Sequence, residues 1–188
     1  MKVSREQVAE NRRKILDAAG RLFRERGYEA VTVAEVMKAA GLTHGAFYGY
    51  FSSKDDLIAQ ALAHVLAASV APGKDLSRYA AAYLSAKHRE DRAGGCAVAG
   101  LGGESVRQSA DVRKMMTEAL RRQIERLSQG APGATAEERR RAAIGSWAAM
   151  VGAVVLSRLA DDPSLADEVL AETRAWIGRV PADAAPQD

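Results

Sequence analysis

The stretch TVAEVMKAAGLTHGAFYGYFSSK, residues 32–54, decides how the rest of this 188-residue chain is interpreted. Thr32 and Glu35 form an S/T-x-x-E capping box, which predicts a helix start because both side chains satisfy backbone N–H groups there. Gly41 predicts the end of that helix, since glycine adopts the left-handed C-cap conformation without steric cost. The hydroxyl of Thr43 is then placed to cap a second short helix.

Two short helices joined by a tight turn containing glycine form the pattern of a helix-turn-helix, whose second helix can enter the major groove of DNA. The spacing alone fits an ordinary helical hairpin equally well. Phe47 and Phe51 lie four positions apart and are expected to anchor the second helix in a core. Basic residues lie upstream at 12–14, and Lys54 opens the next helix. These flanking cations favour the DNA-binding interpretation.

At this point the chain resembles a known family. Residues 11–57 are similar to the N-terminal DNA-binding domain of TetR-type transcriptional regulators, through the quoted stretch and the residues Arg26-Gly27-Tyr28 that precede it. Two positions depart from the family pattern. Val36-Met37 stands where an Ile-Ala pair is usual, and Ala46 stands where a hydroxyl residue is common.

The helical periodicity of the remaining sequence predicts an all-α protein of about nine helices. We expect a three-helix DNA-binding domain over residues 1–52, an effector-binding and dimerisation domain over 53–181 and a disordered tail over 182–188. A helix expected over 75–88 is followed by one over 96–108, which the resemblance suggests more than its glycine-rich composition does. Further helices are predicted over 111–129, 135–160 and 162–180.

Charge and cysteine content limit the functional class. Residues 1–55 contain ten Lys and Arg against seven Asp and Glu, and residues 56–188 contain seventeen of each sign, so the net charge of +3 lies in the predicted DNA-binding part. One cysteine permits no intrachain disulfide, which fits a reducing cytoplasm. The N-terminus has no apolar region typical of a secretory signal. The uncharged run 142–157 is shorter than the ~20 residues of a membrane span, so no membrane association is expected.

The DNA contacts are predicted on and around the second short helix. Thr32 and Thr43 are expected to offer hydroxyls and helix N-terminal amides to phosphate, and the resemblance assigns phosphate contacts to Tyr48 and Lys54. Four further candidates are expected to face the bases; they are His44, Gly45, Ala46 and Tyr50. Gly49 is also a candidate DNA-binding residue. For Tyr50, packing against the first helix is the alternative.

The helix expected over 135–160 is apolar on more than one face, so it must be buried on two sides. One partner is the preceding helix of the same chain, and the other is inferred to be a second copy of the protein, as the resemblance implies for the last two helices. The alternative is a core helix within one chain. The predicted interface consists of Trp147, Val151, Val154, Val155, Val169 and Trp176.

An effector pocket is expected from the resemblance, lined by aromatic and methionine side chains that suit an apolar or aromatic ligand. Its candidate residues are Tyr79, Tyr83, Cys96, Met115, Met116 and Trp147. An ordinary hydrophobic core explains the same residues. Cys96 follows two glycines near a predicted helix N-terminus, where a thiolate is stabilised. It is therefore a candidate sensor of thiol-reactive compounds, with a small buried side chain as the alternative.

No catalytic pattern is found. Gly103-Glu104-Ser105-Val106-Arg107 lacks the final glycine of a nucleophile elbow, and the three histidines have no partner at metal-ligand spacing. No enzyme, cofactor or metal site is expected. The sequence predicts a homodimeric one-component regulator, most simply a repressor, which binds a palindromic double-stranded operator and is released by a small-molecule or thiol-reactive effector. A helical protein-interaction module and a small helical enzyme are the alternatives.

Overall fold

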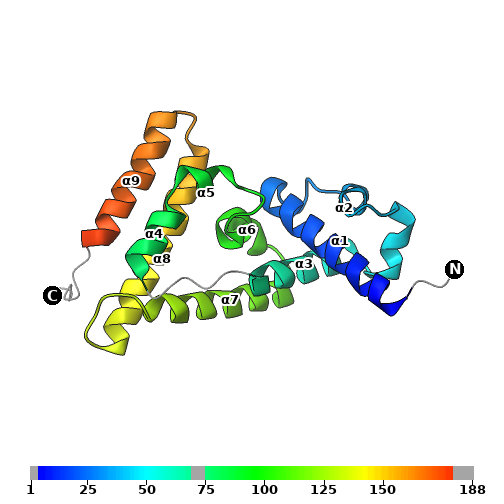
Figure 1. Cartoon of the computed structure of the whole chain (residues 1–188), viewed down its shortest axis with the longest axis horizontal. Coiled ribbons are helices and arrows are strands. Elements are labelled where there is room, and N and C mark those ends of the chain that lie inside the picture. Colours follow the sequence, from blue (N-terminus) through cyan, green and yellow to red (C-terminus); the bar gives the residue numbers. More distant parts are fainter. Residues whose placement is uncertain (1–3, 69–74, 180–188) are drawn as a thin grey trace. The chain divides into compact units, whose positions relative to one another are not determined.

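The computed structural model describes residues 4–68 and 75–179. The pair Pro72-Gly73, which predicts a helix break, and the predicted tail over 182–188 lie outside these ranges. Within them every regular element is a helix, which confirms the all-α prediction (Figure 1). The elements are α1 (Arg5–Arg26), α2 (Val33–Ala39), the 3₁₀ helix η1 (His44–Gly49), α3 (Lys54–Ala68), α4 (Leu76–Tyr83), α5 (Ala86–Glu90), α6 (Ala97–Ser105), α7 (Ala110–Ser128), α8 (Ala136–Leu159) and α9 (Pro163–Arg179).

These helices form two compact units. The first contains α1, α2, η1, α3, α6 and the start of α7 as far as Met116. The second contains α4, α5, the rest of α7, α8 and α9. By packing, therefore, α3 and α6 belong with the helix-turn-helix, although the sequence assigns both to the effector-binding part. That functional division at residue 52 stays a prediction.

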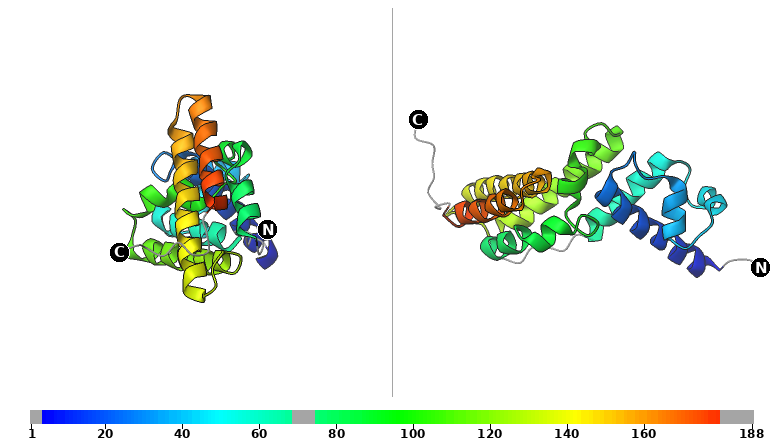
Figure 2. Two further views of the ribbon diagram at one scale, coloured as in Figure 1. Left: turned by 90° about the vertical axis from the view of Figure 1, so that its left-hand side faces the viewer. Right: turned by 90° about the horizontal axis from the view of Figure 1, so that it is seen from above.

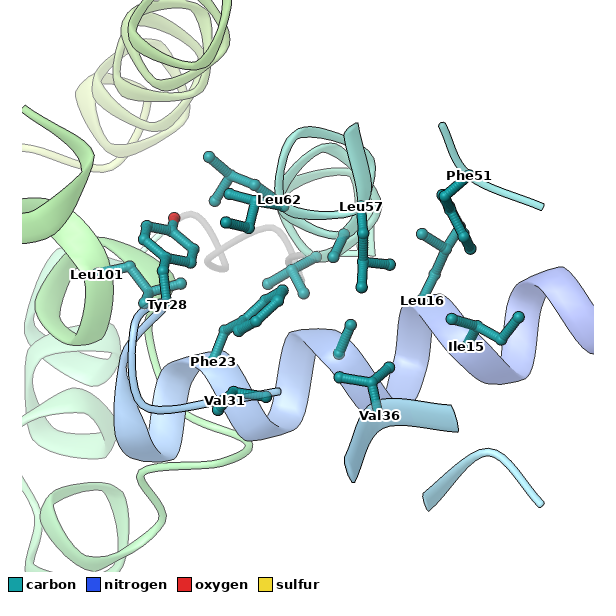
Figure 3. Packing of buried hydrophobic residues seen from close by; sticks show 14 of the residues in the cluster. Ile15, Leu16, Phe23, Tyr28, Val31, Val36, Phe51, Leu57, Leu62 and Leu101 are labelled. Atoms are coloured by element: carbon teal, nitrogen blue, oxygen red, sulfur yellow. The ribbon is translucent and has the colours of Figure 1, made fainter. Parts of the chain in front are cut away.

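The first unit is built around one hydrophobic core in which α1 packs against α2, α3 and α6 (Figure 3). The apolar residues at helical spacing lie in this core: Leu22 and Leu42 are half-buried at its edge, and the buried ones are Ile15, Ala19, Phe23, Val31, Val36, Phe47 and Phe51. Met37 has no exposed surface, so the bulkier side chain at this departure from the family pattern fills the core rather than obstructing the turn. The α6 residues Ala97 and Leu101 complete the same core.

The prediction of one continuous helix over 75–88 is wrong, because the structure has two helices there, α4 and α5, and Leu84 is the C-cap residue of α4. The hydroxyl of Ser85 caps α5 by accepting a hydrogen bond from the backbone N–H of His88 (3.2 Å). The His88 ring lies 2.7 Å from the carbonyl oxygen of Tyr83 at the end of α4. Burial lowers the pKa of His88, and this favours the neutral ring that donates to that carbonyl. Two local polar contacts thus stabilise a break that hydrophobic periodicity does not reveal.

In the second unit α8 and α9 lie side by side (Figures 1 and 2). The predicted capping box at the start of α8 is present, since Thr135 accepts a hydrogen bond from the N–H of Glu138 (3.1 Å) and Glu138 accepts one from the N–H of Thr135 (3.0 Å). By length and composition α8 could cross a membrane, with a mean hydropathy of 1.5 over its most apolar 18-residue window. A core helix of a soluble protein passes the same test.

Candidate nucleic-acid interface

The second helix of the helix-turn-helix is a short 3₁₀ helix fixed by one aromatic side chain. Phe47 is 2% exposed and stacks on Phe51 with ring centroids 5.7 Å apart, which confirms the predicted anchor pair. Tyr48 is 76% exposed, and its ring lies edge-on to that of Phe47 with centroids 5.2 Å apart. Phe47 therefore attaches η1 to the core, while Tyr48 remains on the surface.

Two predicted base-facing residues point inward instead. Ala46 and Tyr50 are half-buried and pack against the core of the first unit. The Tyr50 hydroxyl accepts a hydrogen bond from the side-chain amide of Asn11 on α1 (3.0 Å). The alternative of packing against the first helix is thus the one found for Tyr50. This bond links the C-cap residue of η1 to α1, and Asn11 was missed because the two residues are 39 positions apart.

The glycines of η1 have no role inside the protein that requires glycine. A Cβ atom built on Gly45 or Gly49 has no neighbouring atom within 4 Å, and neither residue has a positive φ. Glycine in a helix costs ~1 kcal/mol relative to alanine, so its use at both positions calls for another explanation. Space for a close approach by a partner molecule provides one.

The two threonines differ in what their hydroxyls are free to do. Thr32 donates its hydroxyl proton to Glu35 (2.8 Å) and accepts from the Glu35 N–H (3.2 Å), so its side chain is occupied by the predicted capping box. Thr43 occupies the N-cap position of η1 but makes no side-chain capping bond, and it is exposed. The predicted cap by Thr43 is therefore wrong, and its hydroxyl remains available to a ligand.

Negative charge at the start of α2 also argues against a phosphate at Thr32. Glu35 accepts hydrogen bonds from the backbone and hydroxyl of Thr32 and from Arg26 (2.9 Å). These bonds, those of Thr32 above all, lower the pKa of Glu35 to about 2. The carboxylate therefore occupies the helix N-terminus where a phosphate would otherwise bind.

This capping box predicts a dependence of stability on acid pH. Because the folded-state pKa of Glu35 lies below the ordinary value of 4.5, its ionised form stabilises the fold above about pH 4.5 and that contribution is lost as the pH falls toward 2. Thermal unfolding of wild type and Glu35→Gln should therefore differ most above pH 5, with the wild type more stable, and converge toward pH 2. A difference that is constant from pH 2 to 6 would contradict this assignment.

Lys54 follows η1 in the chain and is the first residue of α3. Its ammonium group donates to the carbonyl oxygen of Glu29 (3.4 Å), which leaves two of its three protons for another acceptor. The start of α3 is fixed by Asp56, which accepts from the Ser52 N–H (2.9 Å) and from the Gln60 amide (2.6 Å). Gln60 in turn accepts from Arg12 of α1. These contacts, which the sequence did not reveal, fix the start of α3, where Lys54 lies.

The predicted effector-pocket residues fall into both compact units. Tyr79, Tyr83 and Trp147 belong to the second unit, whereas Cys96, Met115 and Met116 belong to the first. Tyr79 and Tyr83 have ring centroids 5.7 Å apart, and Gln123 donates to the Tyr79 hydroxyl (3.1 Å). Cys96 is the half-buried N-cap residue of α6. Across residues 4–68 and 75–179, no three His, Cys, Asp or Glu side chains gather as a metal site.

Two of the predicted interface residues are internal to the chain. Val154 has no exposed surface and Trp147 is 7% exposed, because both lie on the side of α8 that faces its own unit. Val151, Val155 and Val169 are half-buried, and Trp176 is 54% exposed. Of the predicted set, only these last four reach the surface.

Comparison with known proteins places this arrangement in a family. Residues 15–61 match the family described as "Bacterial regulatory proteins, tetR family". This segment belongs to the TetR family. AcrR, a transcriptional regulator of Shigella flexneri, is 40% identical over 57 residues, which are 30% of this chain and 26% of AcrR. The Mycobacterium tuberculosis repressor Rv1474c is 45% identical over 56 residues, 30% of each chain. The matched segment therefore spans less than a third of these relatives.

Solved structures extend the likeness to nearly the whole chain. Reduced Escherichia coli NemR superposes with a TM-score of 0.72 at 23% identity, covering 93% of this chain and 99% of NemR. A TetR-family regulator from Cytophaga hutchinsonii gives 0.71 at 19% identity, covering 97% and 100%. At these identities the likeness establishes the fold, and it confirms the predicted combination of a helix-turn-helix domain with a C-terminal helical domain. The sequence relatives are named as transcriptional regulators, which supports the prediction that this chain is not an enzyme.

Proposed function

We propose that this chain is a one-component transcriptional regulator that binds double-stranded DNA through η1, most simply as a repressor. The observation that carries the proposal is the surface of η1, where two glycines without internal purpose lie beside an unoccupied Thr43 hydroxyl. A protein backbone approaches base edges closely where side chains are absent. The match of residues 15–61 to the TetR family and the names of the relatives support the same function.

The exposed residues divide into two kinds of DNA contact. Thr43, Tyr48 and Lys54 suit phosphate, since each offers a proton donor at the edge of the segment. His44 is exposed at the first position of η1 and suits a base edge. We withdraw Thr32 from the phosphate contacts, because its hydroxyl is occupied by Glu35.

Salt titration of DNA binding separates these roles. Lys54→Ala should weaken binding to all sequences alike and reduce the slope of log affinity against log salt by about one unit. His44→Ala should leave that slope unchanged and relax the preference at one operator position. The measurement is binding of each protein to DNA flanking its own gene, at several salt concentrations. Wild-type binding that ignores salt would instead favour a protein-interaction module.

We further propose that the protein acts as a homodimer through α8 and α9. The exposed side of α8 is apolar, with Ile144 42%, Leu156 57% and Leu159 75% exposed. Gly145 and Gly152 lie in the same stripe, and a Cβ atom on either would meet nothing within 4 Å. A stripe of this kind accepts a close-packed helix from a second copy. Two copies of η1 would then reach successive major grooves of a palindromic operator, ~34–36 Å apart.

Release from DNA by an effector completes the proposal, and Cys96 is one candidate sensor. The structural relative NemR is described in a reduced form. In this chain Cys96 precedes α6 and is half-buried. An alkylating agent should lower the DNA affinity of wild type and leave Cys96→Ser unaffected. Equal responses of the two proteins would leave a ligand bound near Tyr79, Tyr83 or Trp147 as the remaining proposal.

A further inference from the structure

The joint between α1 and α2 is held by two residues of α6 that lie more than 70 positions away. The Glu104 carboxylate accepts a hydrogen bond from the backbone N–H of Tyr28 (2.7 Å). The next residue, Ser105, shares a hydrogen bond with the Tyr28 hydroxyl (3.1 Å). Tyr28 is fully buried, and Figure 3 shows its ring beside Leu101 of α6. The backbone N–H and the hydroxyl of this buried tyrosine therefore both find their partners on α6.

Two glycines allow α6 to pack closely against the joint between α1 and α2. Gly27 has φ +86°, and a Cβ atom there would collide with the Glu104 carboxylate. Gly100 of α6 lies against the end of α1, since a Cβ atom on it would stand 3.3 Å from the carbonyl oxygen of Arg24. The Arg24 guanidinium also donates to the Gly95 carbonyl just before α6 (3.3 Å). Glycine is thus used on both sides of the contact.

The same short loop supports the DNA-binding segment. Lys54, a proposed phosphate ligand, donates to the carbonyl of Glu29 (3.4 Å). Arg26 donates to the carbonyl of Ala30 (3.0 Å) and pairs with the capping carboxylate of α2 (2.9 Å). The loop between α1 and α2 is therefore fixed by α6 at Tyr28 and by Lys54 at the adjacent residue. A shift of α6 would therefore move Tyr28 and, with it, the Glu29 carbonyl that Lys54 contacts.

The α6 helix itself is weakly stabilised. Gly102 and Gly103 have no atom closer than 3.9 Å to a built Cβ, so close packing does not require glycine there. Each lowers the stability of the helix relative to alanine. A helix of nine residues that contains them is near the limit of its own stability, so its position depends on contacts with the rest of the unit. These contacts include the hydrogen bonds to Tyr28 and the burial of Ala97 and Leu101.

We propose that Glu104 and Ser105 are positioning residues for DNA binding, which hold the helix-turn-helix in its binding geometry through Tyr28. Displacement of α6 then lowers DNA affinity through the joint between α1 and α2. This inference rests on the proposed DNA-binding function. It adds a structural coupling between α6 and η1, which runs through α1 and the loop that follows α1.

The test compares Glu104→Ala with three reference variants. Glu104→Ala leaves the buried Tyr28 N–H without a partner, so its amide should exchange with solvent faster and DNA affinity should fall roughly tenfold. Glu104→Gln keeps an acceptor oxygen and should restore both. Glu25→Ala removes the same charge from an exposed position of α1, and loss of a negative charge alone favours DNA. Ile58→Val, in the same core, supplies a variant destabilised without a change at Tyr28.

Hydrogen exchange is measured without DNA, and affinity is measured well below the unfolding temperature of every variant. The inference is overturned if Glu104→Ala binds DNA as tightly as Glu25→Ala, or if Ile58→Val loses as much affinity at equal loss of stability. It is also overturned if Tyr28 exchange is the same in Glu104→Ala and wild type. Wild type that fails to bind any DNA sinks the proposed function, and with it this inference, whatever the exchange result.

Discussion

Gly45→Gln is expected to lower DNA affinity by roughly 10- to 100-fold while the protein remains as stable as wild type. Inside the protein the Cβ atom of the new side chain meets nothing within 4 Å, and the residue requires no strained φ. Against DNA it would enter a closely packed interface, where an inserted side chain costs ~1–3 kcal/mol, and each 1.4 kcal/mol is a factor of ten. The measurements are DNA affinity and the thermal unfolding midpoint of the same preparation.

Ala63→Gln provides the matched control. Ala63 is an exposed residue of α3 in the same compact unit, outside the proposed DNA contacts, so the same side chain there should leave affinity unchanged. If Gly45→Gln bound DNA like wild type, η1 would not lie against the bases. If Gly45→Gln unfolded at a markedly lower temperature, the glycine would have a structural role that the packing does not reveal.

Local sequence patterns predicted this fold well where the stabilising partners are close in the chain. The capping boxes at Thr32 and Thr135 bring together residues three positions apart, and Phe47 and Phe51 are four apart. Such pairs are fixed by helical geometry alone. Thr43 shows the limit of this reasoning, because η1 is a short 3₁₀ helix in which the hydroxyl makes no cap. A cap residue identifies a helix start but not how its side chain is used.

Contacts between distant residues account for what the sequence could not reveal. The orientation of Tyr50 depends on Asn11, and the fixation of Tyr28 depends on Glu104. No periodicity relates residues 39 or 76 positions apart, so each of these pairs exists only after the helices have packed. The same holds for Val154, whose apolar character fits an interface and a core equally well until its neighbours are known.

Leu156→Glu is expected to convert the proposed dimer into a monomer at concentrations where the wild type is fully associated. In an interface with twofold symmetry, each substitution acts twice. Losing the burial of one leucine costs ~1.5–3 kcal/mol, so two copies cost ~3–6 kcal/mol and raise the dissociation constant about 10²- to 10⁴-fold. Two like charges brought together add to that loss. The measurement is molar mass in solution over a wide range of protein concentration.

The control for this prediction is Ala171→Glu, which adds the same charge to an exposed residue of α9. At 100° per residue it lies about 140° around the helix from Trp176, away from the proposed interface, and it should remain dimeric. DNA affinity should fall for Leu156→Glu alone, because a monomer occupies one half-site and loses the effective concentration that the second half-site provides. A wild type that is monomeric throughout, or a Leu156→Glu protein as dimeric as Ala171→Glu, would remove α8 from the interface and require another explanation for its exposed apolar stripe.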